Sequence, residues 1–264
     1  MSLATIDPTA RKVPPLGGLN PTLLKLELRR MFRNKRTIIF ALVFPTVMFF
    51  VFGSGGQGDQ PLGHGLHGNV SAYVMVSMAL YGGALMAASG GAMVATERAL
   101  GWSRQLRLTP LSPTAYIGVK ALVALVVAGF SVLIVNLVGA FKGTPQMPTS
   151  TWIYCALLSL LCTATFAALG VFAGYVLPGE NVMQVLGPGL AMLAFLGGLF
   201  IPLTQYSAVV RDIAYWTPMY GVAEVARAPL THELPWYAVV NAVGWFVIFA
   251  AGAAWRMSRD TARV

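Results

Sequence analysis

Histidine is the side chain most often used for metal binding and acid–base catalysis, and this sequence of 264 residues has three. His64 and His67 stand three residues apart in a Gly-rich stretch, a spacing that two ligands of one metal ion can have. Asp59 is the only further ligand nearby, and a flexible Gly-rich segment does not hold ligands in place. We therefore expect no metal site, with a metal held by this pair as the alternative.

A partial metalloprotease pattern surrounds the third histidine. His232 and Glu233 begin H-E-x-x-H, but Trp236 stands where the second histidine should be, and Pro235 interrupts the helix. All three histidines fall in segments that we predict outside the membrane, so no Ser–His pair is available at membrane depth. We expect no catalytic residues, and an intramembrane enzyme is the weakest of the functions considered.

The sequence also indicates how transport would be powered. An ion-coupled carrier normally has an ionisable residue near mid-bilayer, whereas here Glu97 and Lys120 stand near the ends of apolar segments. The sequence has no G-x-x-x-x-G-K-[S/T] loop for ATP. We therefore expect no cofactor in this chain, with ATP and Mg²⁺ bound by a separate ATPase subunit.

The composition is that of a membrane protein. The sequence is 56% hydrophobic and only 10% charged, with a mean hydropathy of +0.68, too apolar for an ordinary soluble domain. A bilayer core about 30 Å thick needs roughly 20 apolar residues per helix. The runs are apolar on both faces, which favours helices over barrel strands. We predict an all-α integral membrane protein with six spans, at residues 37–54, 71–95, 118–141, 151–177, 182–203 and 236–255.

Lys and Arg residues are distributed unevenly around these spans. Eight precede the first span and three lie between the second and third, whereas the segments predicted outside contain only Lys142, Arg211 and Arg227. Positive residues are retained on the cytoplasmic side. Both termini are therefore predicted in the cytoplasm, with the chain in the plasma membrane. The net charge of +9 then reflects topology, and we expect no nucleic-acid partner.

The residues before the first span form two parts. Residues 1–18 are rich in Pro and Gly, as in a flexible lead, and residues 19–264 form a single transmembrane domain. Pro21 begins an amphipathic helix, predicted to lie along the inner membrane surface in contact with lipids. The alternative is a cytoplasmic extension of the first span. Its basic residues are Lys25, Arg29, Arg30 and Arg33.

Two further segments have distinctive patterns. Residues 203–234 are too polar for a span and too long for a turn, and Pro218 divides them into two short amphipathic helices. We predict that these re-enter the outer leaflet, and the alternative is a loop packed over helix ends. Gly83, Ala87 and Gly91 form a stripe of small residues that permits close helix contact.

The segment from Glu97 to Pro113 connects the second and third spans on the cytoplasmic side. Its pattern predicts a short basic helix that ends at Pro110 and Pro113. Such a projection suits docking in the cleft of a partner, with Glu97 and Arg104 as solvated charges that face it. The alternative is an ordinary positive connector that fixes the topology.

These motifs together resemble the permease subunits of type II ATP-binding-cassette exporters, of the daunorubicin-resistance and polysaccharide-export kind. The resemblance covers nearly the whole chain and includes the run TIIFALVFPTVMFFVFG and the pattern Thr109-Pro110-Leu111-Ser112-Pro113. It implies an ATPase-coupling helix containing Glu97, Arg98, Gly101, Trp102, Arg104 and Arg107. It also implies outer re-entrant helices marked by Pro202, Ile213, Pro218, Tyr220 and Arg227.

The resemblance implies partners and a function. The chain would pair with a second permease copy, as a homodimer or heterodimer, and with separate ATPase subunits. Together they would export a hydrophobic or amphipathic compound, such as a drug, lipid or glycan, and could confer antibiotic resistance. The rival is a membrane scaffold or immunity protein without transport activity.

Overall fold

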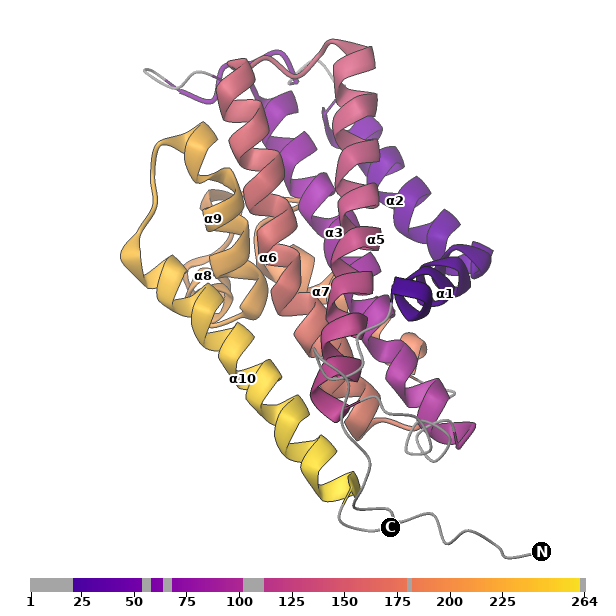
Figure 1. The fold of residues 1–264 in the computed structure, drawn as a ribbon. Coiled ribbons are helices and arrows are strands. Elements are labelled where there is room, and N and C mark those ends of the chain that lie inside the picture. Colours follow the sequence, from indigo (N-terminus) through magenta and orange to yellow (C-terminus); the bar gives the residue numbers. More distant parts are fainter. Residues whose placement is uncertain (1–20, 54–57, 64–67, 102–111, 180–181, 262–264) are drawn as a thin grey trace, which may run out of the picture.

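The computed structural model describes residues 21–53, 58–63, 68–101, 112–179 and 182–261, and in these ranges the chain is a bundle of helices (Figure 1). The predicted all-α class is confirmed. A 3-10 turn at Leu203–Gln205 and one isolated bridge between Pro61 and Asn69 are the other regular features described. The helices are α1 Pro21–Arg33, α2 Lys35–Gly53, α3 Val70–Ala99, α5 Pro113–Lys142, α6 Thr149–Val176, α7 Val182–Leu196, α8 Ala208–Tyr215, α9 Pro218–Thr231 and α10 Trp236–Thr261.

Four of these helices, α3, α5, α6 and α10, are long and apolar enough to cross a membrane, and α1 with α2 makes a bent fifth candidate. The segment predicted to span at residues 182–203 is different, because its helix α7 has only 15 residues. At about 1.5 Å per residue, such a helix is shorter than a bilayer core of about 30 Å. The predicted count of six spans therefore stays a prediction.

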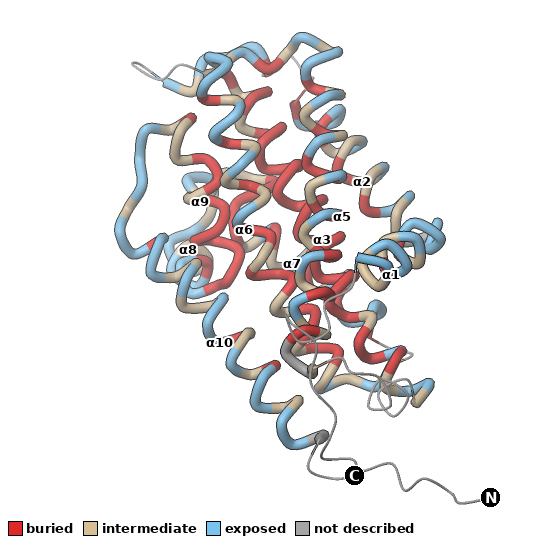
Figure 2. The backbone as a smooth tube through the Cα atoms, viewed as in Figure 1, coloured by how far each residue is buried: buried red, intermediate tan, exposed pale blue. Residues whose placement is uncertain are grey.

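Helix α3 lies at the centre of the bundle and contacts α2, α5, α6, α7 and α9. Figure 2 shows its buried residues running along most of its length, whereas much of α10 at the edge of the bundle is exposed. The exposed residues of α10 include Val240, Val247 and Ile248, which are apolar. This pattern is expected of a bundle whose outer surface faces lipid.

Glycines bring α3 and α6 into their close contact, the most extensive between any two helices. A Cβ atom on Gly170 would overlap the Ala88 carbonyl group, and one on Gly91 would overlap the backbone of residues 167–171. Apolar helices gain little hydrophobic free energy by associating in lipid, so such backbone approach supplies much of the attraction. The predicted stripe of small residues does lie in a helix interface, since Gly83 also packs closely, against Thr163.

The axis of α1 makes an angle of 62° with that of residues Ile38–Gly53 of α2. Helix α1 is therefore a separate helix and not a straight extension of the first span. Leu24 and Leu28 are half-buried and Met31 is buried, which is the predicted apolar face. Part of this side of α1 contacts α5, where Phe32 and Phe130 meet edge to face at 5.6 Å between ring centroids.

The α3–α6 contact predicts that Gly170→Ala destabilises the protein, whereas Gly244→Ala on α10 does not. A Cβ at Gly244 meets no atom within 4 Å, so this substitution should be neutral or, through helix propensity, stabilising by up to about 1 kcal/mol. The clash at Gly170 should cost about 1–3 kcal/mol. Thermal unfolding in detergent, followed by size-exclusion chromatography, measures both. Equal stability of the two variants would contradict the packing described.

Candidate functional site

A cluster of buried charges joins α1, α3 and α5. Lys120 Nζ on α5 forms ion pairs with Glu27 on α1, at 2.6 Å, and with Glu97 on α3. Arg30 on α1 donates to the same carboxylate oxygen as Lys120, with 2.7 Å between its Nη1 and Glu97 Oε1. Tyr116 Oη donates to Glu97 Oε2. We call these five residues the inner cluster; it holds two carboxylates and two cations, so its formal charge is balanced.

Helical spacing places these groups together. Glu27, Arg30 and Met31 lie within one turn of α1 and share the face that turns towards α5. Tyr116 and Lys120 are four residues apart on α5, with Lys120 Nζ 5.4 Å from the centroid of the Tyr116 ring. Ser112 starts α5 by accepting a hydrogen bond from the backbone N–H of Ala115, which fixes where the first turn begins.

Burial of Glu97 corrects the prediction that it is a solvated charge facing a partner. Its exposed fraction is only 2%, and those of Lys120 and Glu27 are 1% and 6%. Carboxylates enter such a site only when paired and hydrogen-bonded, and Glu97 has three donors from two neighbouring helices. Its side chain therefore holds helices of its own chain together.

The other residues predicted for ATPase coupling have different positions. Arg98 turns to the C-terminal end of α6, where its guanidinium donates to the carbonyls of Gly174 and Tyr175 at 3.2 and 3.1 Å. Gly101 follows α3 in the left-handed conformation, with φ of 69°. Trp102, Arg104 and Arg107 lie outside the described residues.

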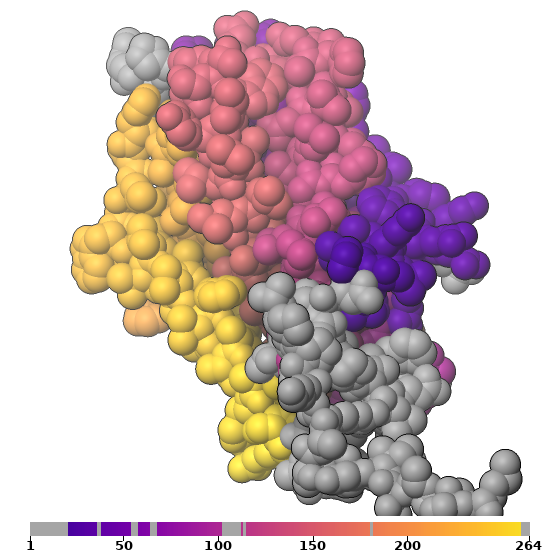
Figure 3. All heavy atoms as spheres, viewed as in Figure 1, coloured from indigo at the N-terminus to yellow at the C-terminus, as the bar shows by residue number. Residues whose placement is uncertain are grey.

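The four basic residues predicted to share one face of α1 do not all face outward in the structure. Lys25, Arg29 and Arg33 are exposed, whereas Arg30 turns inward to Glu97. Figure 3 shows α1 projecting from the side of the bundle next to α5. The three exposed cations are therefore available to a surface outside the bundle, and Arg30 is used for internal pairing.

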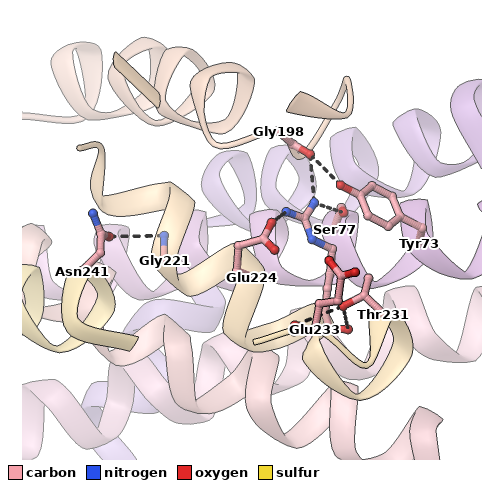
Figure 4. A network of polar contacts seen from close by, with 9 residues as sticks. Tyr73, Ser77, Gly198, Gly221, Glu224, Thr231, Glu233 and Asn241 are labelled. Atoms are coloured by element: carbon pink, nitrogen blue, oxygen red, sulfur yellow. Dashed lines mark hydrogen bonds and ion pairs between the residues drawn. The ribbon is translucent and has the colours of Figure 1, made fainter. Parts of the chain in front are cut away.

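A second buried cluster, the outer cluster, surrounds Arg227 on α9. Figure 4 labels its partners Tyr73, Ser77, Gly198 and Glu224. Its guanidinium pairs with Glu224 at 2.7 Å and donates to the carbonyl of Gly198 at 2.9 Å and to the Ser77 hydroxyl at 3.4 Å. It also lies 4.5 Å from the centroid of the Tyr73 ring. Gly198 follows α7 with φ of 71°, so Arg227 binds the turn that ends α7 and connects it to α3.

The other residues predicted for the outer segment lie on or beside two short helices, as expected of residues 203–234. Pro218 is the first residue of α9, and Tyr220 is buried and stacks on Tyr237 with 6.2 Å between ring centroids. Ile213 on α8 is exposed, and Pro202 immediately precedes the 3-10 turn. Re-entry of these helices into a leaflet stays a prediction.

Several residues of these sites were not singled out in the sequence. Glu27 and Tyr116 complete the inner cluster, and Glu224 completes the outer one. Asn241 on α10 accepts from the backbone N–H of Gly221 and donates to the Tyr215 carbonyl, which ties α10 to α8 and α9. An acidic residue on the apolar side of an amphipathic helix, as at Glu27, is the one signal that could have indicated burial.

Helix α2 presents an exposed apolar face. Ile39, Phe40, Val43, Phe44 and Val47 line an open groove of about 470 Å³ along this face. Aromatic contacts continue from it into the bundle, as Phe44 lies 5.8 Å from Tyr81 and 6.5 Å from Phe200 between ring centroids. The two histidines of the Gly-rich stretch lie outside the described residues, and His232 ends α9 with φ of 54°.

The inner cluster predicts that Lys120→Met is strongly destabilising. It leaves Glu27 buried without its cation, and breaking a buried ion pair on one side costs about 3–5 kcal/mol. Adding Glu27→Gln removes the unpaired charge and should restore part of the loss. Lys142→Met, at the other end of α5, is the matched control. Thermal unfolding in detergent checks this order, and a double variant no more stable than Lys120→Met alone would refute it.

The outer cluster predicts a graded effect at Arg227. Arg227→Ala removes donors from Glu224 and the Gly198 carbonyl, and should cost about 2–3 kcal/mol of unfolding free energy. Arg227→Lys keeps the charge but not the planar fork, so its loss should be smaller. Limited proteolysis and thermal unfolding measure both, with Arg211→Ala on α8 as the control. If Arg227→Ala behaves like the control, the cluster does not hold α9.

Comparison with known proteins agrees with this architecture. The sequence profile described as ABC-2 type transporter matches residues 20–230, a range that runs from α1 to the last turn of α9. The chain is also 23% identical over 227 residues to the Bacillus subtilis (strain 168) protein named "Putative transport permease YvfS", with 84% of this chain and 90% of that relative covered. With most of its length matched, the chain belongs to the ABC-2 type transporter family and is a membrane permease subunit of an ABC transporter.

Proposed function

We propose that this permease exports a hydrophobic or amphipathic compound, driven by ATP that a separate ATPase subunit binds with Mg²⁺ and hydrolyses. The proposal rests on the inner cluster, because Glu97 and Lys120 lie near the ends of the two helices that flank the segment 102–111. Glu97 on α3 and Lys120 on α5 pair directly, so the two helices that flank this segment are joined by buried charges. A force on the segment would therefore reach both helices together.

The orientation that supports this coupling comes from the charge distribution. In the proposed topology both termini and the segment 102–111 face the cytoplasm of a cell whose plasma membrane holds the chain. The exposed cations of α1, Lys25, Arg29 and Arg33, would then lie at the level of anionic lipid head groups of the inner leaflet. A cytoplasmic ATPase could reach the basic segment from that side.

A second permease copy would complete the transport path. One bundle of these helices is packed around α3 and leaves little room for a drug-sized compound. The exposed apolar face of α2, with its groove beside Phe40 and Phe44, supports a helix contact with another permease, either an identical chain or a related one. The path would then run between the two copies.

The outer segment supports an amphipathic cargo. Helices α8 and α9 would re-enter the outer leaflet, with Arg227 holding α9 to the end of α7 and to α3. Aromatic side chains gather there, and Tyr215, Tyr220 and Tyr237 contact one another. Aromatic rings with polar edges suit compounds that leave a membrane, such as drugs, lipids or glycans with a lipid part.

The proposal predicts that Arg104→Ala with Arg107→Ala abolishes stimulation of the ATPase and export, while expression and membrane insertion persist. Charges that face a partner's cleft contribute several kcal/mol when they are desolvated and paired there. Loss of an exposed charge otherwise changes stability by only about 0.5 kcal/mol. Copurification with the ATPase, its hydrolysis rate in liposomes and efflux of a fluorescent amphipathic dye are the measurements.

The matched control is Arg259→Ala, an exposed cation near the end of α10. It should leave ATPase stimulation unchanged. A scaffold or immunity protein would bind its partner without stimulating any ATPase. Normal stimulation by the Arg104/Arg107 double variant would leave the segment as a topological connector.

A further inference from the structure

The exposed apolar face of α2 continues beyond its groove towards the outer end of the helix. Ile39, Val43, Val47 and Phe50 follow one another at steps of three or four positions, so they share one side of α2, and all four side chains are exposed. The residues that line the groove end at Val47, and Phe50 lies about one turn further along. The proposed path between two copies follows this face, so a compound reaches Phe50 as it leaves the groove.

A cation from α5 lies over the ring of Phe50. Lys142 Nζ is 4.6 Å from the centroid of this ring and 5.7 Å from that of the buried Phe49. The faces of aromatic rings attract an ammonium group, but they do not neutralise its charge. None of the ion pairs found among the described residues includes Lys142. Its side chain is only half-buried, so its charge is available to an anion.

The outer end of α5 is held in place. Gly143 ends the helix directly after Lys142 in the left-handed conformation, with φ of 70°. The buried side chain of Asn69 donates to the Thr144 carbonyl at 2.7 Å and accepts from the backbone N–H of Gln146 at 3.0 Å. The backbone that carries Lys142 is thus fixed before any ligand arrives, which lowers the entropy cost of binding.

We infer that Lys142 and Phe50 bind the anionic head group of an amphipathic cargo at the outer end of the α2 face. The inference rests on the proposed function, and it narrows the cargo to compounds with a negatively charged group, such as a phosphate, beside an apolar part. An ammonium group is a point charge, so it selects for charge and not for the shape of one acid.

The α2 face also has room for the apolar part of such a compound. The 11 positions from Ile39 to Phe50 correspond to about 16 Å along the helix axis. An acyl chain or a ring system can therefore lie on this face while its head group reaches Lys142. The site combines apolar contact and one opposite charge, the two features that an anionic amphiphile presents.

Binding in detergent tests the site without an ATPase. The probes are fluorescently labelled phosphatidylglycerol and phosphatidylcholine, which share their acyl chains and differ in net charge. The permease should bind the anionic probe several-fold more tightly. Lys142→Met removes the charge and keeps the apolar stem, so it should bind both probes equally, and Lys142→Arg should keep the preference. The same preference in the wild type and Lys142→Met overturns the inference.

Two controls are matched to the two residues of the site. Arg211→Gln removes another cation predicted on the outer side, on α8, and should keep the preference for the anionic probe. Phe50→Leu removes the ring beneath the ammonium group and should weaken the preference, whereas Phe52→Leu, at another exposed ring of α2, should not. A preference lost equally in Arg211→Gln and Lys142→Met would reflect the net charge of the protein, and would also overturn the site.

Export distinguishes a cargo from a lipid that only surrounds the bundle. In liposomes that contain the permease with its ATPase, the wild type should export labelled phosphatidylglycerol faster than labelled phosphatidylcholine. Lys142→Met should lose this difference while its rate of ATP hydrolysis stays that of the wild type. Equal export of the two probes by the wild type, despite unequal binding, would mean that Lys142 binds a membrane lipid only, and this overturns the assignment to the cargo.

Failure of the proposed function gives a different result. The permease then stimulates no ATPase with either probe, whereas the preference in detergent and its loss in Lys142→Met persist. Failure of the head-group site alone leaves ATP hydrolysis and export intact, with no difference between the wild type and Lys142→Met for either probe.

Discussion

The cost of burying charge is the constraint on which the arrangement of this bundle depends. A carboxylate or ammonium group removed from water is tolerated only beside groups that replace its hydration. Glu97 meets this condition through donors from α1 and α5, and Arg227 meets it through Glu224, Ser77 and a backbone carbonyl. These two requirements help to hold the short helices α1 and α9 against the bundle.

Apolar packing alone would not have determined these positions. The exposed surfaces of α2 and α10 are nearly as apolar as the interior, so hydrophobicity does not decide which side of a helix turns inward in lipid. Close backbone approach decides it for α3 and α6, where Gly91 and Gly170 leave room. Polar pairing contributes at α1, which contacts chiefly α5, and it adds to the packing of α9 against α6 and α10.

The sequence predicted the helical class, a separate α1 and two short helices between residues 203 and 234. Hydropathy and proline positions carry this information locally, so no knowledge of the fold was needed. It did not predict the end of α7 at Leu196, where Gly197 and Gly198 turn the chain, because the apolar run continues to residue 202. The burial of Glu97 was also missed, since its partners come from residues 67 positions earlier and 23 later.

Both buried clusters involve α3, at opposite ends of the same helix. Ser77 belongs to the outer cluster and Glu97 to the inner one, and their separation of 20 positions corresponds to about 30 Å along the axis. A continuous helix does not stretch or compress readily, because each turn is held by its own hydrogen bonds. Translation of α3 along its axis at the inner cluster must therefore be accommodated at Arg227, by sliding of Ser77 past the guanidinium or by movement of α9. The two ends of the permease are mechanically connected for this reason, without any contact between the clusters themselves.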